Sequence, residues 1–209
     1  MRRLLRIRIY GSTLAALCLM AAAPAVLSAQ VGPSDVALFK SAFQSTDYDV
    51  NHTALKAVDG NTDGNFSNHS VAVTSDTPAP WWYVDLGGDY DISSITLWGR
   101  TDCCANRLAN FWLSVLASGT PNVWSTSAPT VWQVLTPGAV GTTTAYTVPS
   151  GTIGRFVRVQ FNNQEYLQIA EVDVEGTVAV SATPEPSSLA LLATGLAGVW
   201  YRTRRRRRA

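Results

Sequence analysis

The sequence predicts an all-β sandwich, and three observations between residues 30 and 176 support this prediction. No stretch of this segment has the 3.6-residue apolar period of an amphipathic helix. Short runs that alternate apolar and polar residues recur instead, and β-branched and aromatic residues dominate them. Clusters of Gly, Pro, Asn, Asp, Ser and Thr separate the runs at short spacing, as they do in sandwiches of antiparallel strands.

Four runs carry the strand prediction, in chain order. Residues 95–97 alternate after a glycine-rich turn, and residues 111–116 place a large apolar side chain at every second position. Residues 157–161 and 171–175 repeat the alternation with valines on one side and charged or amide side chains on the other. Each run therefore presents one face to a core and one to solvent. The adjacent pair Trp81 and Trp82 is predicted to fill the base of this core.

Residues 1–29 are predicted to be a secretory signal peptide. Four of the first eight residues are arginines, an apolar stretch follows over residues 11–27, and Leu27-Ser28-Ala29 offers a cleavage site. The chain is therefore expected to be exported.

The C-terminal end is expected to be a second targeting segment, because residues 177–183 are a short linker and residues 184–209 have a tripartite order. Pro-Glu-Pro is followed by an apolar run over 189–201 and then by an arginine-rich tail. Thirteen helical residues reach only about 20 Å, short of a hydrocarbon core of about 30 Å, so a permanent tail anchor is the weaker alternative. The order resembles the bacterial PEP-CTERM sorting signal, which implies transient membrane association, arginines on the cytoplasmic side and removal by an exosortase.

Charge separates the ends of the chain from its middle. Ten of the sixteen Lys and Arg lie in the leader and the tail, whereas residues 30–183 hold six of them against fourteen Asp and Glu, a net charge of −8. Nucleic acid and anionic membrane surfaces are therefore not expected partners of this domain. Its only cysteines are Cys103 and Cys104, in a compartment where a disulfide can persist.

Residues 100–107, Arg-Thr-Asp-Cys-Cys-Ala-Asn-Arg, carry the chemistry. Adjacent cysteines cannot join distant strands, but when oxidised they close an eight-membered ring with a stiff, weakly polar surface. Forked guanidinium groups beside such a ring can donate to hydroxyl and ring oxygens of a sugar. The predicted sugar-binding residues are Arg100, Asp102, Cys103, Cys104 and Arg107, with Asp102 orienting one guanidinium. A surface ion-pair cluster is the alternative.

This block resembles the binding motif of the F-type lectins, or fucolectins. That motif is a His, 26 further residues, and then Arg-x-Asp-x-x-x-x-Arg or Lys, usually with Cys-Cys inside. The resemblance covers about residues 35–176. It implies the eight-stranded jelly-roll sandwich of the discoidin-like, galactose-binding-like group, a fucose-related ligand and a structural calcium ion.

Residues 56–65 pack Asp, Asn and Gly into one turn, which suits the oxygen-rich coordination of calcium. The segment imitates the opening of an EF-hand, but Ser70 stands where an EF-hand needs a bidentate Glu and no helices flank it. The resemblance implies instead a calcium site formed by Lys56, Asp59, Asn61, Ser70, Ala170 and Glu171, with Lys56, Asn61 and Ala170 contributing backbone oxygens. A solvated turn without metal is the alternative.

The chain departs from the family pattern at two places. Val73 stands where the motif has its sugar-binding histidine, and His69 could replace it only if the loop rearranged. Val71 and Ala170 stand where many members carry a disulfide, so a packed apolar contact is expected in place of that bridge.

The sequence therefore predicts an exported, calcium-stabilised carbohydrate-binding protein of the bacterial surface or the extracellular polysaccharide matrix. A structural or adhesive matrix protein with a vestigial sugar pocket is the alternative, and Val73 favours it. An enzyme is not expected, since no motif places two carboxylates at hydrolytic separation and His52 and His69 lack metal-ligand spacing.

Overall fold

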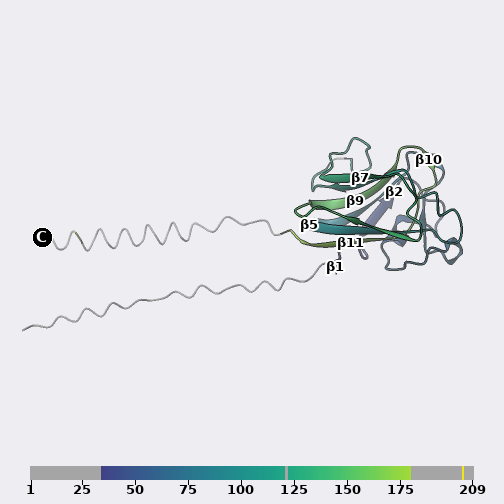
Figure 1. Ribbon diagram of the computed structural model, residues 1–209, viewed down its shortest axis with the longest axis horizontal. Coiled ribbons are helices and arrows are strands. Elements are labelled where there is room, and N and C mark those ends of the chain that lie inside the picture. The colour runs from purple at the N-terminus through teal and green to yellow at the C-terminus, as the bar shows by residue number, and fades with distance from the viewer. Residues whose placement is uncertain (1–33, 121, 180–203, 205–209) are drawn as a thin grey trace, which may run out of the picture. The chain divides into compact units, whose positions relative to one another are not determined.

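Alternating apolar and polar residues build two layers of antiparallel strands in the computed structural model, which describes residues 34–120, 122–179 and 204 (Figure 1). The predicted leader over 1–29 and nearly all of the segment 184–209 lie outside these residues. In the part of the chain that is described, no helix is both long enough and apolar enough to span a membrane.

The strands, in chain order, are β1 Ser34–Asp35, β2 Ser41–Gln44, β3 Ala72–Val73, β4 Thr77–Pro78, β5 Trp81–Gly99, β6 Phe111–Leu116, β7 Trp132–Thr136, β8 Thr143–Thr147, β9 Ile153–Phe161, β10 Gln164–Glu165 and β11 Gln168–Val178. Two 3-10 turns, η1 Ala54–Ala57 and η2 Phe66–Asn68, lie between β2 and β3.

The long strand β5 belongs to both layers. Its register breaks between Asp85 and Tyr90, where Gly87 adopts a φ of 83°. The first half pairs with β2 and β9, and β6 and β7 continue that layer; the second half pairs with β8 and β11. Figure 1 shows β7 and β9 above β11, with β5 between them. Counted as two strands, β5 brings the described strands of four or more residues to eight, as the jelly-roll fold requires.

The core lies between the layers, and the predicted alternation is confirmed. The inward side chains of β6, β9 and β11 are buried, among them Phe111, Val159 and Val172. Trp82 is buried as predicted, and its indole N–H donates to the carbonyl of Ala54 at 3.0 Å. The prediction for Trp81 is wrong: one residue earlier on the same strand, it points to the outer face and lies half-buried.

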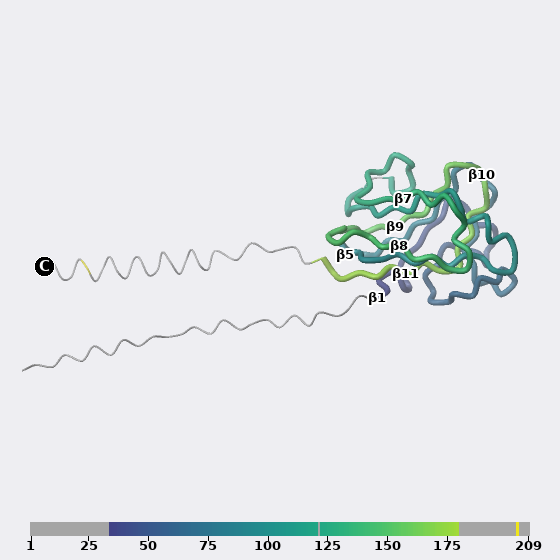
Figure 2. The backbone as a smooth tube through the Cα atoms, viewed as in Figure 1, coloured from purple at the N-terminus to yellow at the C-terminus, as the bar shows by residue number. Residues whose placement is uncertain are grey.

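β11 ends at Val178, two residues beyond the predicted end of the domain, because Thr177 and Val178 continue the ladder opposite Asp91 and Tyr90. The first residues of the expected linker 177–183 are therefore part of the sheet. The long connections between β2 and β5 and between β5 and β6 lie at one end of the sandwich (Figure 2).

Candidate functional site

Two connections meet directly at this end. The N–H of Thr101 donates to the carbonyl of Gly64 at 2.9 Å, and the N–H of Phe66 donates to the carboxylate of Asp102 at 3.2 Å. A side chain at Gly64 would place its Cβ 2.5 Å from the carbonyl oxygen of Gly99, so the two backbones approach as closely as only glycine allows. The motif of residues 100–107 therefore packs directly against the oxygen-rich loop.

The structure joins Cys103 and Cys104 in a disulfide. Cys104 has a φ of 58°, in the left-handed region, which turns the chain back on itself. The N–H of Arg107 then donates to the carbonyl of Cys104 at 2.9 Å. Cys103 is exposed and Cys104 half-buried, so the ring lies at the surface between the two arginines of the motif.

Arg100 is fixed from two sides. Its Nε and Nη2 donate to the two carboxylate oxygens of Asp102 at 2.7 and 2.8 Å, and its Cζ lies 4.4 Å above the ring centre of Phe66. The Arg100 guanidinium holds the pKa of the Asp102 carboxyl well below its usual range. This leaves Nη1 of Arg100 without a hydrogen bond within the described chain.

Arg107 lies over a second ring, with Cζ 5.0 Å from the ring centre of Tyr166 and Nε 3.5 Å from the carboxylate of Glu165. Tyr48 connects the two rings, since its ring centre is 5.6 Å from that of Phe66 and 6.1 Å from that of Tyr166. The two guanidiniums therefore lie on one aromatic patch, here named the ring cluster, formed by Tyr48, His52, Phe66 and Tyr166.

Sequence reasoning placed no member of the ring cluster at this site, and His52 is its most buried member. Its ring stacks on Phe66 with 4.0 Å between centres and 5° between planes, and it is 1% exposed. Its Nδ1 lies 2.7 Å from the carboxylate of Asp49, and this hydrogen bond lowers the pKa of Asp49. His69 is exposed, with its ring centre 5.4 Å from that of His52, at the rim of the cluster. The ring cluster could not be predicted because its members lie far apart in the sequence, although Phe66 directly follows the oxygen-rich loop.

Val73 lies beneath the ring cluster. Its N–H donates to the carbonyl of His52 at 3.0 Å, and its own carbonyl accepts from the N–H of Tyr48 at 2.9 Å. Its side chain is 1% exposed and packs with Val71 and Ala170. This small apolar cluster supplies the packed contact expected in place of the family disulfide, and it leaves the motif's histidine position without a polar group.

The oxygen-rich loop is a series of Asx turns. Four side-chain oxygens each accept the N–H two residues ahead, at 2.9 to 3.1 Å, from Asp59, Asn61, Asp63 and Asn65. Ser70 is buried, and its hydroxyl contacts the carbonyls of Asp63 and Asn65 rather than standing free for a metal. The side chains thus accept hydrogen bonds from the N–H groups of the loop, and the backbone carbonyl oxygens are then available to coordinate a cation.

Glu171 provides the structural test of the calcium prediction. Its side chain is 0% exposed, and neither carboxylate oxygen has a hydrogen-bond partner in the described chain. Burial raises the pKa of Glu171 to about 8; the backbone N–H of Gly60 nearby opposes this shift, and the charges of Asp59, Asp173 and Asp35 add to it. Carboxylate oxygens of Asp35, Glu171 and Asp173 lie within 4.8 Å of one another, a grouping that the sequence did not suggest. A buried, unpartnered carboxylate among other acids fits a hard cation.

The remaining predicted ligands lie around Glu171. The register shift between Ile169 and Glu171 leaves Ala170 without a partner residue in the ladder, as a β-bulge does. Lys56 is in η1, and its Nζ lies 3.9 Å from the carboxylate of Asp59. Its ammonium group therefore pairs with Asp59 and does not occupy the backbone carbonyl that is expected to bind calcium. Within the described chain, the residues present therefore fit a calcium ion held through Asp59, Glu171 and backbone oxygens.

Comparison of the sequence with known proteins identifies related families. A model of the NedA-like, galactose-binding domain matches residues 56–159, and a model of the PEP-CTERM protein-sorting motif matches residues 182–208. Fucolectin-1 of Anguilla japonica is 35% identical over 125 residues, covering 60% of this chain and 68% of that protein. The fucolectin of Anguilla anguilla is 35% identical over 128 residues, covering 60% and 77%.

Solved structures agree with the sequence relatives. The F-lectin (fucolectin) from striped bass serum, Morone saxatilis, has a TM-score of 0.63 at 31% identity, covering 72% of this chain and 51% of that one. A Streptococcus pneumoniae fucose binding module has a TM-score of 0.61 at 26% identity, covering 69% and 96%. The jelly-roll fold, the Arg-x-Asp-Cys-Cys motif and a third of identical residues along most of the eel proteins lead to one conclusion: the chain belongs to the fucolectin (F-type lectin) family.

Proposed function

We propose that this protein is an exported, calcium-stabilised lectin that binds a sugar between Arg100 and Arg107. The observation that carries the proposal is the pair of guanidiniums on one ring cluster with the Cys103–Cys104 disulfide between them in the chain. A pyranose has an apolar face for the disulfide and oxygens for the forked donors. Asp102 fixes Arg100 before the ligand arrives, which lowers the entropy lost on binding.

The ligand class follows from the relatives and from one substitution. Solved neighbours include a fucose binding module and a lectinolysin lectin domain complexed with Lewis b antigen, which supports a fucose-related ligand. Val73 removes one donor, and losing a charge-assisted hydrogen bond costs about 1.5–3 kcal/mol, roughly ten- to a hundredfold in affinity. Binding of a free monosaccharide is therefore expected to be weak.

Calcium has a positioning role in this proposal. The residues that would hold it are Asp59 and Glu171, with backbone oxygens of the loop and Ala170. The same loop donates and accepts the hydrogen bonds that fix Thr101 and Asp102. Binding the ion would neutralise the negative charge of the acids around Glu171 and fix the conformation of the oxygen-rich loop. We assign no catalytic step, since Glu171, the carboxyl with the most raised pKa, is fully buried and cannot reach a glycosidic bond.

Export follows from the predicted leader and from the PEP-CTERM match, which supports exosortase-type processing in a bacterium and a place on the cell surface or in the polysaccharide matrix. The second candidate is a structural or adhesive matrix protein with a vestigial pocket. The buried Val73 favours it, because the polar group of the motif is missing.

A glycan array of the purified protein, run with millimolar calcium and then with a chelator, tests the lectin proposal. Arg100→Ala should abolish binding to fucosylated glycans while the protein stays folded. Arg155→Ala is the matched control, since Arg155 makes the same bidentate pair with Asp85, at 2.7 and 2.8 Å, and also lies over an aromatic ring. Retention of fucosylated glycans that survives Arg100→Ala would favour the matrix protein. Turnover of an aryl glycoside would point to an enzyme.

A further inference from the structure

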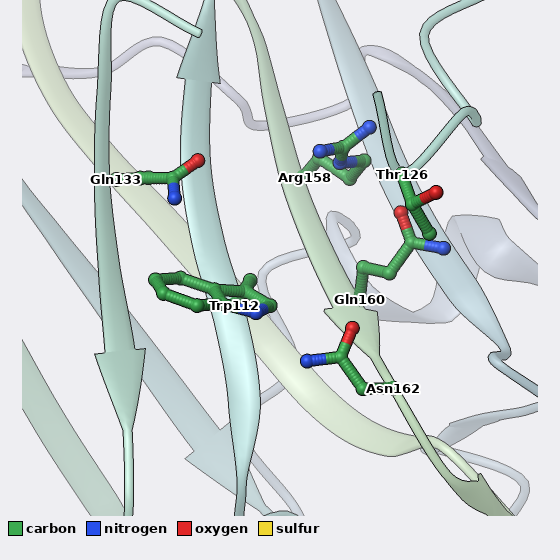
Figure 3. A pocket seen from close by; sticks show the side chains of 6 residues that line it. All are labelled: Trp112, Thr126, Gln133, Arg158, Gln160 and Asn162. Atoms are coloured by element: carbon green, nitrogen blue, oxygen red, sulfur yellow. The ribbon is translucent and has the colours of Figure 1, made fainter. Parts of the chain in front are cut away.

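A second hollow lies on the outer face of the layer formed by β7, β6 and β9, and it shares no lining residue with the Arg100–Arg107 site. Figure 3 shows its lining side chains, which are Trp112, Thr126, Gln133, Arg158, Gln160 and Asn162. The set combines one indole, three amides, one hydroxyl and one guanidinium. It contains no acidic side chain, although the domain is strongly acidic.

The strand register explains how these residues meet. Trp112 of β6 lies opposite Gln160 of β9, and Ser114 lies opposite both Arg158 and Gln133, so all project from the same face. The connection from β6 to β7 folds back over this face. Nη1 of Arg158 donates to the carbonyls of Val123, at 2.8 Å, and Ser125. Thr126 is thereby held at the edge of the hollow.

The charge of Arg158 has no counterion in the described chain. Arg100, Arg107 and Arg155 each form an ion pair with a carboxylate, whereas Arg158, although only 3% exposed, is bonded to carbonyls alone. Burial lowers the pKa of Arg158. A buried cation without an anion is costly, and an anionic ligand would remove that cost.

Several polar atoms beneath the hollow also lack hydrogen-bond partners. Ser114 Oγ, Arg158 Nε and Gln160 Oε1 are enclosed and have no partner within the described chain. At the mouth, the amides of Gln133 and Asn162 are exposed. The floor and the rim can therefore both form hydrogen bonds that the protein does not itself complete.

Size limits the occupant. The cavity holds about 70 Å³, the share of about two water molecules, which accommodates a carboxylate group but not a whole pyranose ring. The indole of Trp112 forms a side wall and is half-buried, so the apolar face of a ring could cover it from outside (Figure 3). Ring hydroxyls would then face Gln133 and Asn162.

We propose that this hollow is a second glycan subsite, which takes the carboxylate of an acidic sugar unit toward Arg158 while the sugar ring lies on Trp112. A uronate of a polysaccharide has this chemistry: one anionic substituent, one apolar ring face and several hydroxyls. The subsite is independent of the Arg100–Arg107 site, and the domain is bivalent for glycan.

The test titrates the purified protein with trigalacturonate, with its methyl ester and with an acidic hexapeptide, at physiological salt. The ester keeps the sugar and removes the charge, whereas the peptide keeps the charge and removes the sugar. Indole N–H signals in NMR spectra report binding, and the Trp112 signal is assigned with Trp112→Phe. We expect trigalacturonate to shift the Trp112 signal, the ester to bind at least about tenfold more weakly and the peptide not to bind.

Variants locate the subsite. Trp112→Ala and Asn162→Ala should each weaken trigalacturonate binding roughly tenfold with the melting temperature checked, and Asn162→Ala decides if Trp112→Ala fails to fold. Phe43→Ala is the control, because Phe43 is an exposed aromatic side chain on β2 that does not line this hollow. Arg100→Ala should leave uronate binding intact, which separates this proposal from the lectin site. Equal binding of the ester or the peptide, or full binding by both Trp112→Ala and Asn162→Ala, would overturn it.

Discussion

Without calcium, the domain is expected to lose stability as the pH rises, because Glu171 then carries a buried charge that has no counterion and that the backbone N–H of Gly60 compensates only in part. Its pKa is 4.5 when the carboxyl is free in water and about 8 in the folded domain. Between these values the folded state holds a proton that the unfolded state has released. The stability that this proton contributes is therefore fully present below about pH 4.5 and is lost as the pH rises through about 8, the reverse of an ion-paired carboxylate.

The magnitude follows from the size of the shift. Each pKa unit corresponds to about 1.4 kcal/mol, so the shift of Glu171 amounts to about 5 kcal/mol at high pH. Asp173, whose pKa burial raises to about 6, adds to the loss in the lower part of the range. Since a domain of this size is stable by about 5–15 kcal/mol, the calcium-free protein should be barely stable at pH 8.5.

Thermal unfolding with a chelator and with millimolar calcium, at about pH 5 and about pH 8.5, measures this linkage. The melting temperature should fall steeply with pH in chelator, whereas calcium should raise it most at the higher pH, because the ion binds the ionised carboxylate. Glu171→Gln should remove both the pH dependence and most of the calcium effect. Glu175→Gln removes an exposed carboxylate on the same strand and should change the pH dependence only slightly, through the pKa of Asp173, and leave the calcium effect unchanged. A chelated protein that is as stable at pH 8.5 as at pH 5 would refute the reasoning.

Three further predictions concern the motif and the loop beside it. Asp102→Asn should weaken glycan binding roughly tenfold with little effect on melting temperature, because Arg100 loses its bidentate partner; an array or titration measures it. Reducing the Cys103–Cys104 disulfide should weaken binding while costing only about 1 kcal/mol of stability, since so short a ring constrains the unfolded chain little; denaturant unfolding with and without reductant tests this. Gly64→Ala should destabilise the domain by about 1–3 kcal/mol and lower its calcium affinity, because the new Cβ would meet the carbonyl of Gly99; calorimetry measures both, and unchanged values would contradict the proposed contact.

Much of the fold could be predicted because each strand's side chains obey a period of two. The alternation in residues 111–116 and 157–161 assigned the inward side chains correctly. The same rule should have placed Trp81 and Trp82 on opposite faces, but the expectation that both fill the core followed their hydrophobicity instead. The outer face of β9 also differs from the pattern, because Arg158 and Gln160 are covered by a loop that no local periodicity can place.

The site was predictable where its residues are neighbours in the sequence and not where the fold brings them together. Residues 100–107 carry their own disulfide and ion pair within eight positions. The ring cluster gathers Tyr48 and Phe66 from the connection between β2 and β3 and Tyr166 from the connection between β10 and β11, so no spacing reveals it. The carboxylate of Glu171 was expected at the metal; Asp173 follows it at i+2 on the same strand, whereas Asp35 reaches them only through the pairing of β1 with β11.

The loss of the motif histidine changes the kind of ligand that this domain can retain. With Val73 beneath the ring cluster, two guanidiniums remain as charged donors, so one sugar unit alone binds weakly. When one polymer binds at both sites, binding at the second site is intramolecular. The overall affinity can then exceed the affinity of either single site by roughly 10²–10⁴. We therefore expect the ligand of the proposed lectin to be a repeating polysaccharide rather than a terminal sugar. Affinity should therefore rise steeply once a glycan is long enough to reach both sites, and this rise should disappear in a protein carrying either Trp112→Ala or Arg100→Ala alone.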